Sequence, residues 1–230
     1  MEQEVKQEKI TKGFVILSMS YLFLLLLANI MALKMLKIGP FVTQSGVLVF
    51  PLVYIISDII TECYGLRLSM LSIRINTACC LVFAIATQIL IILPYPDFWQ
   101  NQSAMASVFG ATPRIVLASL IAYYIGNWSN SSILSFMKVK VNKWGFEARA
   151  IISTIIGEGF DTSLFLLIAF YGVVPNNMLL TMITSQYIFK TLYEIVFIPL
   201  TSKVVNFWKK WDNADYIDTL SKELYNPFSL

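Results

Sequence analysis

Residues 49–65 read VFPLVYIISDIITECYG, an apolar stretch of helical length that contains two carboxylic acids, Asp58 and Glu62. Their spacing of four residues places both acids on one face of a helix. A charge in the middle of a membrane helix costs about 2.5 to 3.5 kcal/mol, so such residues normally face a bundle interior or a polar cavity. The stretch therefore predicts a membrane helix with one polar, inward face.

Two further stretches repeat this arrangement. Glu158 and Asp161 lie three residues apart in one apolar run, and Lys190 and Glu194 lie four residues apart in another. Each pair again shares one helix face. We expect the three stretches to bring these side chains together in one intramembrane polar site.

The composition is typical of an integral membrane protein. Of 230 residues, 57% are hydrophobic and only 13% are charged, and the apolar runs have the roughly 20 residues that cross a bilayer as a helix. We predict an all-α membrane protein, a six-transmembrane-helix bundle that forms a single domain over residues 1–211, followed by a polar tail over residues 212–230. The six spans are expected at residues 14–36, 46–64, 72–93, 114–137, 148–172 and 178–207.

The positions of the cations predict the orientation, because Lys and Arg are enriched in cytoplasmic loops. With the N-terminus inside, thirteen of the seventeen cations fall on the inner side. They are Lys6, Lys9, Lys12, Arg67, Arg74, Lys138, Lys140, Lys143, Arg149, Lys203, Lys209, Lys210 and Lys222. We expect both termini and the tail to be cytoplasmic. Since this rule explains where the cations lie, we expect no nucleic-acid partner despite the net charge of +3.

Several kinds of chemistry are excluded by the residues that the chain lacks. It contains no histidine, which excludes histidine triads and HExxH zinc sites. It has neither a GxxxxGK[ST] loop nor a GxGxxG run, so it cannot hydrolyse ATP through a P-loop or bind a dinucleotide in the usual way. We expect no cofactor, no metal site and no catalytic activity. Energy for any transport must therefore come from an ion gradient or a partner protein. The sequence decides neither whether an ATPase module docks on the chain nor whether the chain forms a homo-oligomer.

Three motifs resemble those of the queuosine precursor transporter family, also called the vitamin uptake transporter family. The first is the Phe50-Pro51 pair that leads into the helix with Asp58 and ends at Tyr64-Gly65. The other two, with a matching asparagine in the first span, complete the pattern in the right order. The second motif is Gly157-Glu158-Gly159-Phe160-Asp161-Thr162, followed by Ile168-Ala169-Phe170. The third is Lys190-Thr191-Leu192-Tyr193-Glu194, followed by Pro199. The matching asparagine is Asn29.

The resemblance implies a six-helix importer, similar in fold to the substrate-binding subunits of energy-coupling-factor vitamin transporters. Its substrates would be 7-deazaguanine precursors of queuosine, namely 7-cyano-7-deazaguanine, 7-aminomethyl-7-deazaguanine or, in some members, queuine. It also implies a multi-pass protein of the bacterial inner membrane. In this family Asp58, Asp161 and Lys190 would occupy core positions, whereas glutamates at the other three positions occur in only some members and would tune substrate choice. Those glutamates are Glu62, Glu158 and Glu194.

The residue chemistry suits such a base. A guanine-like edge presents adjacent N–H donors that a carboxylate accepts in a pair of hydrogen bonds, which is the role we expect for Asp58 or Asp161. Lys190 can donate to the ring carbonyl oxygen. As we expect Lys190 to be the only cation available to neutralise the five intramembrane acids, we expect some of the glutamates to be protonated, or a cationic aminomethyl group to be bound.

Other polar and aromatic residues near these faces are weaker candidates for substrate binding. Aromatic rings can stack on a flat base, and amides can bond it, although both also serve ordinary helix packing. The aromatic candidates are Phe50, Tyr54 and Trp128, and the amide candidates are Asn29, Asn76 and Asn127.

Three alternatives compete with the transporter interpretation. An intramembrane aspartyl-type hydrolase would use Asp58 and Asp161 as a carboxylate dyad with a shared proton. A membrane scaffold subunit would need the charges only for assembly. A salt bridge from Lys190 to an aspartate would merely hold helices together.

Overall fold

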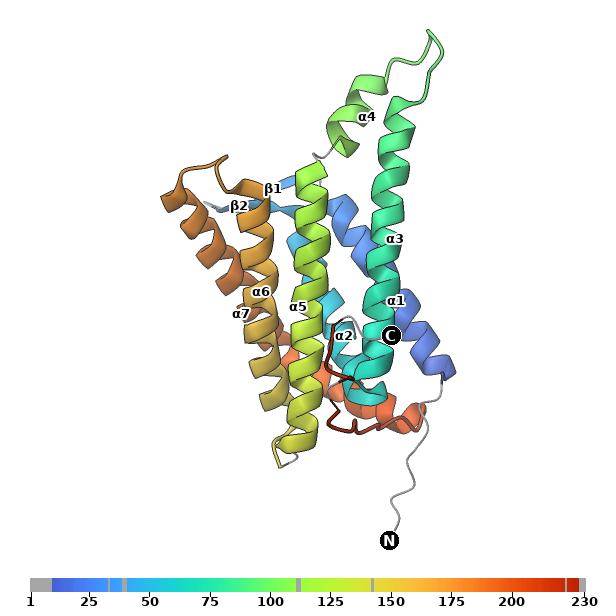
Figure 1. Cartoon of the computed structure of the whole chain (residues 1–230), viewed down its shortest axis with the longest axis vertical. Helices are drawn as coiled ribbons and strands as arrows, with labels where there is room; N and C mark the ends of the chain where they lie inside the picture. The colour runs from blue at the N-terminus through green and yellow to red at the C-terminus, as the bar shows by residue number, and fades with distance from the viewer. Residues whose placement is uncertain are drawn as a thin grey trace.

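The computed structural model describes residues 10–32, 34–38, 41–110, 113–141, 143–221 and 223–227. Most of them are α-helical, as predicted (Figure 1). The helices are α1 (Lys12–Met31), α2 (Phe50–Tyr64), α3 (Leu66–Ile92), α4 (Gln102–Phe109), α5 (Pro113–Lys140), α6 (Phe146–Phe170) and α7 (Asn176–Trp211). Each of the six expected spans overlaps one of the helices α1, α2, α3, α5, α6 and α7.

Two segments differ from the all-helical expectation. The first span was expected to continue to residue 36, but α1 ends at Met31 and a short antiparallel hairpin follows. It consists of β1 (Met35–Ile38) and β2 (Phe41–Gln44), and a 3-10 turn, η1 (Ser45–Leu48), connects it to α2. Lys34 and Lys37 end the apolar run here, and their charges favour the membrane surface. The short helix α4 lies in the expected loop between the third and fourth spans.

Within the residues that the structure describes, four stretches are long and apolar enough to cross a membrane. They are Lys12–Met31, Leu66–Ile92, Gln102–Lys140, which includes α5, and Phe146–Phe170. Helix α2 has 15 residues and therefore measures about 22 Å, short of a hydrocarbon core of about 30 Å. Helix α7 is long enough, at 36 residues, but interrupts its apolar residues with charged and amide side chains.

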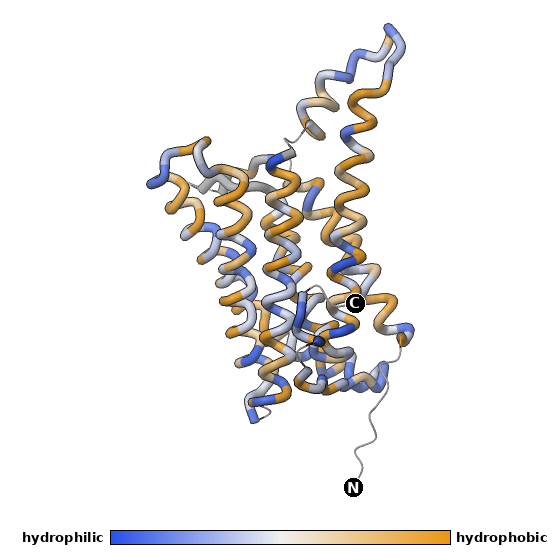
Figure 2. The backbone as a smooth tube through the Cα atoms, viewed as in Figure 1, coloured by the Kyte–Doolittle hydropathy of each residue, from blue (hydrophilic) through white to orange (hydrophobic). Residues whose placement is uncertain are grey.

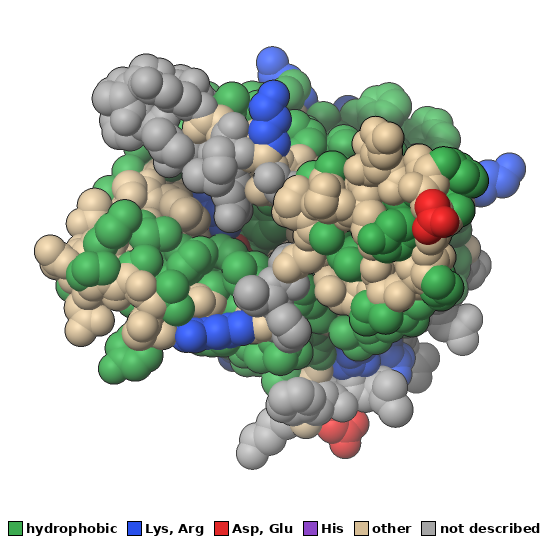
Figure 3. All heavy atoms as spheres, turned by 90° about the horizontal axis from the view of Figure 1, so that it is seen from above, with side chains coloured by type: hydrophobic (Ala, Val, Ile, Leu, Met, Phe, Trp, Pro, Cys, Tyr) green, Lys and Arg blue, Asp and Glu red, His purple; other side chains and the backbone are tan. Residues whose placement is uncertain are grey.

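The outward faces of the helices are apolar. Large side chains such as Phe23, Val82 and Val196 are exposed, and hydrophobic residues line most of each long helix (Figure 2). Viewed from above, hydrophobic side chains also cover much of the molecule, with few acidic groups among them (Figure 3). Exposed apolar surface on this scale fits a lipid environment rather than water.

Helices α5, α6 and α7 pack in sequence, and α2 lies among α1, α5 and α7. Two glycines bring α5 and α6 close together. A Cβ atom on Gly126 would lie 2.6 Å from the Cβ of Asp161, and one on Gly157 would lie 2.6 Å from the Cβ of Asn130. Only glycine permits so close an approach of two backbones. The contact places the polar side chains of α6 beside those of α5.

The start of α1 and the end of α7 meet at the end of the bundle where α2 ends. Thr11, just before α1, donates a hydrogen bond to Asp212, just after α7. The phenol of Tyr64 also donates to Asp212, at 2.6 Å. Helix α7 reaches this point because it crosses the bundle obliquely (Figure 1).

Candidate functional site

Charged residues in the middle of α6 and α7 form one buried cluster. The Nζ atom of Lys190 lies 2.7 Å from Asp161 Oδ2 and 3.2 Å from Glu158 Oε2. It also lies 4.5 Å above the ring centre of Phe50, at the start of α2, where a cation gains from the negative face of the ring. Lys190 thus connects three helices through two carboxylates and one aromatic ring.

Asp58 of α2 joins this region through α5. Its Oδ1 atom accepts a hydrogen bond of 2.6 Å from Nδ2 of Asn130. Asn130 is fully buried, and the close approach at Gly157 brings it next to α6. The sequence interpretation missed Asn130; the signal available was the dense polar run from Asn127 to Ser135 inside an otherwise apolar helix.

Several polar atoms of this cluster are buried without a hydrogen-bond partner among the described residues. Glu194 Oε2 accepts from Thr154 at 2.8 Å, but the other carboxylate oxygen, Oε1, is unpartnered. The same holds for Glu158 Oε1, the Tyr54 hydroxyl and Asn130 Oδ1. A buried polar group without a partner costs about 1 to 3 kcal/mol. This concentration of unpartnered polar atoms makes the region a candidate binding site for a polar ligand.

Access to the cluster differs between its two sides. Glu158, Glu194 and Asp161 are 0%, 2% and 4% exposed, so a ligand reaches them only when helices move apart. Phe50 and Lys190 are half-buried and form the more open side. Because Phe50 begins α2, this side faces the end of the bundle that carries the β-hairpin (Figure 1).

We call the following group of residues the central cluster: Asp58, Asn130, Glu158, Asp161, Lys190 and Glu194. The two aspartates have different partners in it, an amide for Asp58 and an ammonium group for Asp161. No hydrogen bond joins the two aspartates within the described chain. Each aspartate is thus held by a side chain from another helix.

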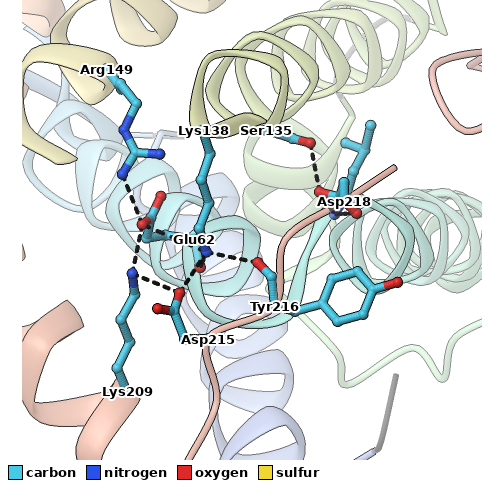
Figure 4. A network of polar contacts seen from close by, with 9 residues as sticks. Glu62, Ser135, Lys138, Arg149, Lys209, Asp215, Tyr216 and Asp218 are labelled. Atoms are coloured by element: carbon cyan, nitrogen blue, oxygen red, sulfur yellow. Dashed lines mark hydrogen bonds and ion pairs between the residues drawn. The ribbon is translucent and has the colours of Figure 1, made fainter. Parts of the chain in front are cut away.

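Glu62 lies outside the central cluster, in an ion network at the other end of α2 (Figure 4). Its Oε1 atom is 2.9 Å from Arg149, 2.7 Å from Lys209 and 3.7 Å from Lys138. The prediction that Lys190 is the sole neutralising cation is therefore wrong. The reason is that cations near the ends of α5, α6 and α7 fold inward over the last turn of α2.

The polar tail completes this network. Asp215 lies 2.7 Å from Lys138 and 2.9 Å from Lys209, the same cations that contact Glu62. Burial acts to raise the pKa of Asp215, but the hydrogen bonds and charges of the two lysines outweigh it and hold that pKa below its usual value. Lys138 also donates to the carbonyl oxygen of Tyr216, at 2.7 Å.

Asp218 attaches the tail to α3 and α5. Its two carboxylate oxygens accept from the backbone N–H of Leu66, at 3.1 and 3.0 Å, and one also accepts from Ser135 at 2.6 Å. These bonds satisfy a donor in the first turn of α3. Burial raises the pKa of Asp218 above its usual value, although the bonds from Ser135 and Leu66 act against it.

The three candidate asparagines bond other helices instead of the central cluster. Asn127 Oδ1 accepts from the Tyr21 hydroxyl at 2.8 Å. The side-chain amide of Asn76 donates to a tyrosine hydroxyl, and that of Asn29 donates to a cysteine sulfur. Those contacts are Asn76 Nδ2 to Tyr123 at 3.5 Å and Asn29 Nδ2 to Cys80 at 3.6 Å. Trp128 is half-buried in α5, and its indole N–H has no partner in the described part of the chain.

Comparison with known proteins agrees with these features. A family model described as "Putative vitamin uptake transporter" matches residues 44–204. The "Queuosine precursor transporter" of Escherichia coli (strain K12) is 26% identical over 198 residues, which cover 84% of this chain and 87% of that protein. The "Probable queuosine precursor transporter" of Bacillus subtilis (strain 168) is 21% identical over 173 residues, 75% of this chain and 76% of that protein.

No solved structure matches the chain. The family match begins before α2 and continues through Pro199 in α7, so it contains every member of the central cluster. It also covers most of the chain. The protein belongs to the vitamin uptake transporter family.

Proposed function

We propose that this protein imports queuosine precursors across the bacterial inner membrane for incorporation into transfer RNA. The names of two relatives, each similar over most of its length, support this substrate class. The observation that carries the proposal is the central cluster, with its buried, unpartnered acceptor atoms between apolar helices. Ionisable residues inside a membrane protein mark a substrate or ion path by default.

The substrate is a 7-deazaguanine base, either the 7-cyano or the 7-aminomethyl form, or queuine. Its adjacent N–H donors suit the carboxylate of Asp58, with Asn130 beside it to contribute an amide acceptor. Lys190 donates to the ring carbonyl oxygen. Phe50, which already contacts the Lys190 ammonium group, offers a face for stacking, and Tyr54 packs against Phe50 with ring centres 5.8 Å apart.

The bundle crosses the membrane six times with both termini in the cytoplasm. Support comes from the contact between Thr11 and Asp212, which puts the start of α1 and the end of α7 on one side. Lys138, Arg149 and Lys209 gather at that same end, as the enrichment of cytoplasmic cations requires. The half-buried pair of Phe50 and Lys190 then faces the outer side, from which the substrate arrives.

Uptake in cells that cannot synthesise the precursors tests the proposal. Each precursor is supplied, and queuosine in transfer RNA is measured. We expect the wild type to restore queuosine, and Asp58→Asn, Asp161→Asn and Lys190→Ala to lower it by at least tenfold, because each loses a charge-assisted bond. Glu147→Gln, an exposed change on α6, is the matched control. A well-inserted wild type that restores no queuosine from any precursor would refute the proposal.

A further inference from the structure

The central cluster contains more acid than base. Four carboxyl groups, those of Asp58, Glu158, Asp161 and Glu194, are buried, and the one ammonium group of the cluster, that of Lys190, contacts only Glu158 and Asp161. No other ion pair to these four groups is found in the described ranges. Burying several carboxylates with one counter-charge is unfavourable in a membrane. The cluster therefore lacks counter-charge, which an additional positive group would supply.

The excess lies between α6 and α7. Lys190 contacts Asp161 and only the Oε2 atom of Glu158, while Oε2 of Glu194 is taken by Thr154. The remaining oxygen of each glutamate is buried and unpartnered within the described chain. The two glutamate carboxyls lie within hydrogen-bonding reach of each other, so a proton held between them serves as the donor when no ligand is bound. Together they present two acceptors to one location.

The Tyr54 hydroxyl is the third polar group at this location. It is fully buried and has no partner among the described residues, and it lies close to Asp161 and to both glutamates. A primary ammonium group has three donors and no acceptor. Two carboxylate oxygens and one hydroxyl oxygen match that donor set in number and in charge.

We propose that Glu158 and Glu194, with Tyr54, form a subsite for a positively charged amine on the transported base. This inference rests on the proposed import of queuosine precursors and specifies it further: the preferred substrate carries an ammonium group. A neutral nitrile in the same place offers no donor, so it leaves both glutamate oxygens without a partner. An unsatisfied polar site discriminates strongly against a ligand that lacks the expected donor.

The test compares uptake of 7-aminomethyl-7-deazaguanine, whose side chain is cationic, with uptake of the neutral 7-cyano-7-deazaguanine. Both are supplied at matched concentrations to cells that cannot make either, and the ratio of the two initial rates is recorded. We expect the wild type to favour the aminomethyl form. Glu194→Gln and Glu158→Gln should lower the ratio about tenfold or more, because a hydrogen bond to a charged group is lost.

Two further variants distinguish recognition of the substrate's charge by the glutamates from a purely structural role. Glu194→Asp keeps the negative charge and should retain a ratio above one, unlike Glu194→Gln. Glu147→Gln removes a glutamate of α6 that is exposed and bonded to Ser202, and its ratio should equal that of the wild type. All variants are compared at equal amounts of protein in the membrane.

The outcomes are distinct. A glutamine variant that slows both substrates by the same factor, or changes neither, would overturn the subsite, because the glutamates would then act in proton coupling or packing. A wild type that takes up only the neutral base would also overturn it, while import itself would stand. A wild type that takes up neither base would refute the import proposal and this inference with it.

Discussion

At the scale of single residues, the candidate site depends on partners that are remote in sequence. Asp58 is held by Asn130, and Asp161 by Lys190, so each charged group of the central cluster is positioned by another helix. A buried charge that loses its partner is costly, because no water replaces the lost bond. Single substitutions should therefore have large effects on both uptake and stability.

Asn130→Ala should lower the unfolding free energy by about 1 to 3 kcal/mol, because it leaves the buried Asp58 carboxylate without its hydrogen bond. Uptake should fall as well. Thermal unfolding of the purified protein in detergent measures the first effect. The matched control is Ser132→Ala on the same helix, whose hydroxyl has no partner among the described residues. Equal melting temperatures for the two variants would contradict the role given to Asn130.

Glu62→Gln should destabilise the protein more strongly, by about 3 to 5 kcal/mol, since it removes the acid shared by three cations. Glu62 and Arg149 are 1% and 6% exposed, so little water is available to replace the ion pair between them. The same unfolding experiment applies, with exposed Glu147→Gln as the control. A loss no larger than that of the control would show that the network adds nothing to stability.

Asp215 predicts a pH dependence. Its pKa is lowered in the folded state, so its ionised form stabilises the fold above the unfolded pKa of about 4, and this contribution is lost as pH falls through the lowered folded value. The melting temperature of the wild type should exceed that of Asp215→Asn at neutral pH, and the difference should shrink on acidification. A difference that grew as the pH fell would have the wrong sign.

At the scale of elements, the contact between α5 and α6 determines the geometry of the site. It places Asn130 on α5 beside the acidic face of α6, and it depends on glycine at positions 126 and 157. Interiors are packed too densely to absorb an added methyl group without movement. The helix pair is therefore sensitive at those two positions and tolerant elsewhere.

Two glycines on α6 allow a matched test. A Cβ atom on Gly157 would lie 2.6 Å from the Cβ of Asn130, whereas the nearest atom to one on Gly159 is in Tyr187, at 3.7 Å. We expect Gly157→Ala to cost about 1 to 3 kcal/mol and to lower uptake. Gly159→Ala should be tolerated. Similar uptake by both variants, at equal expression, would show that the site does not depend on the close contact between α5 and α6.

At the scale of the whole molecule, the tail acts as a strap over the end of the bundle. Through Asp215 it contacts cations of α5 and α7, and through Asp218 it contacts the start of α3. The backbone N–H of Tyr216 also donates to the carbonyl oxygen of Cys63, at 3.0 Å. The tail therefore covers the last turn of α2, where Glu62 lies.

The native cysteines can report on this strap. Cys63 is 0% exposed beneath the tail, whereas Cys80 is buried in α3 beside Asn29. In a variant that keeps only Cys63, Asp218→Ala should increase the rate of maleimide labelling, because the tail loses its bond to α3. In a variant that keeps only Cys80, the same change should leave labelling unaffected. Unchanged labelling of Cys63 would show that Asp218 does not hold the tail in place.

The sequence by itself determined the helices and the identity of most charged residues in the central cluster. Apolar run length and the spacing of acids on one helix face are local properties, so Asp161 and Lys190 could be recognised without a structure. What only the tertiary structure decided is which side chains meet. Glu62 lies one helical turn from Asp58, yet it belongs to a different network, because its partners are the cations at the ends of three other helices. Partner choice across helices depends on their rotation and closeness, which no local pattern encodes.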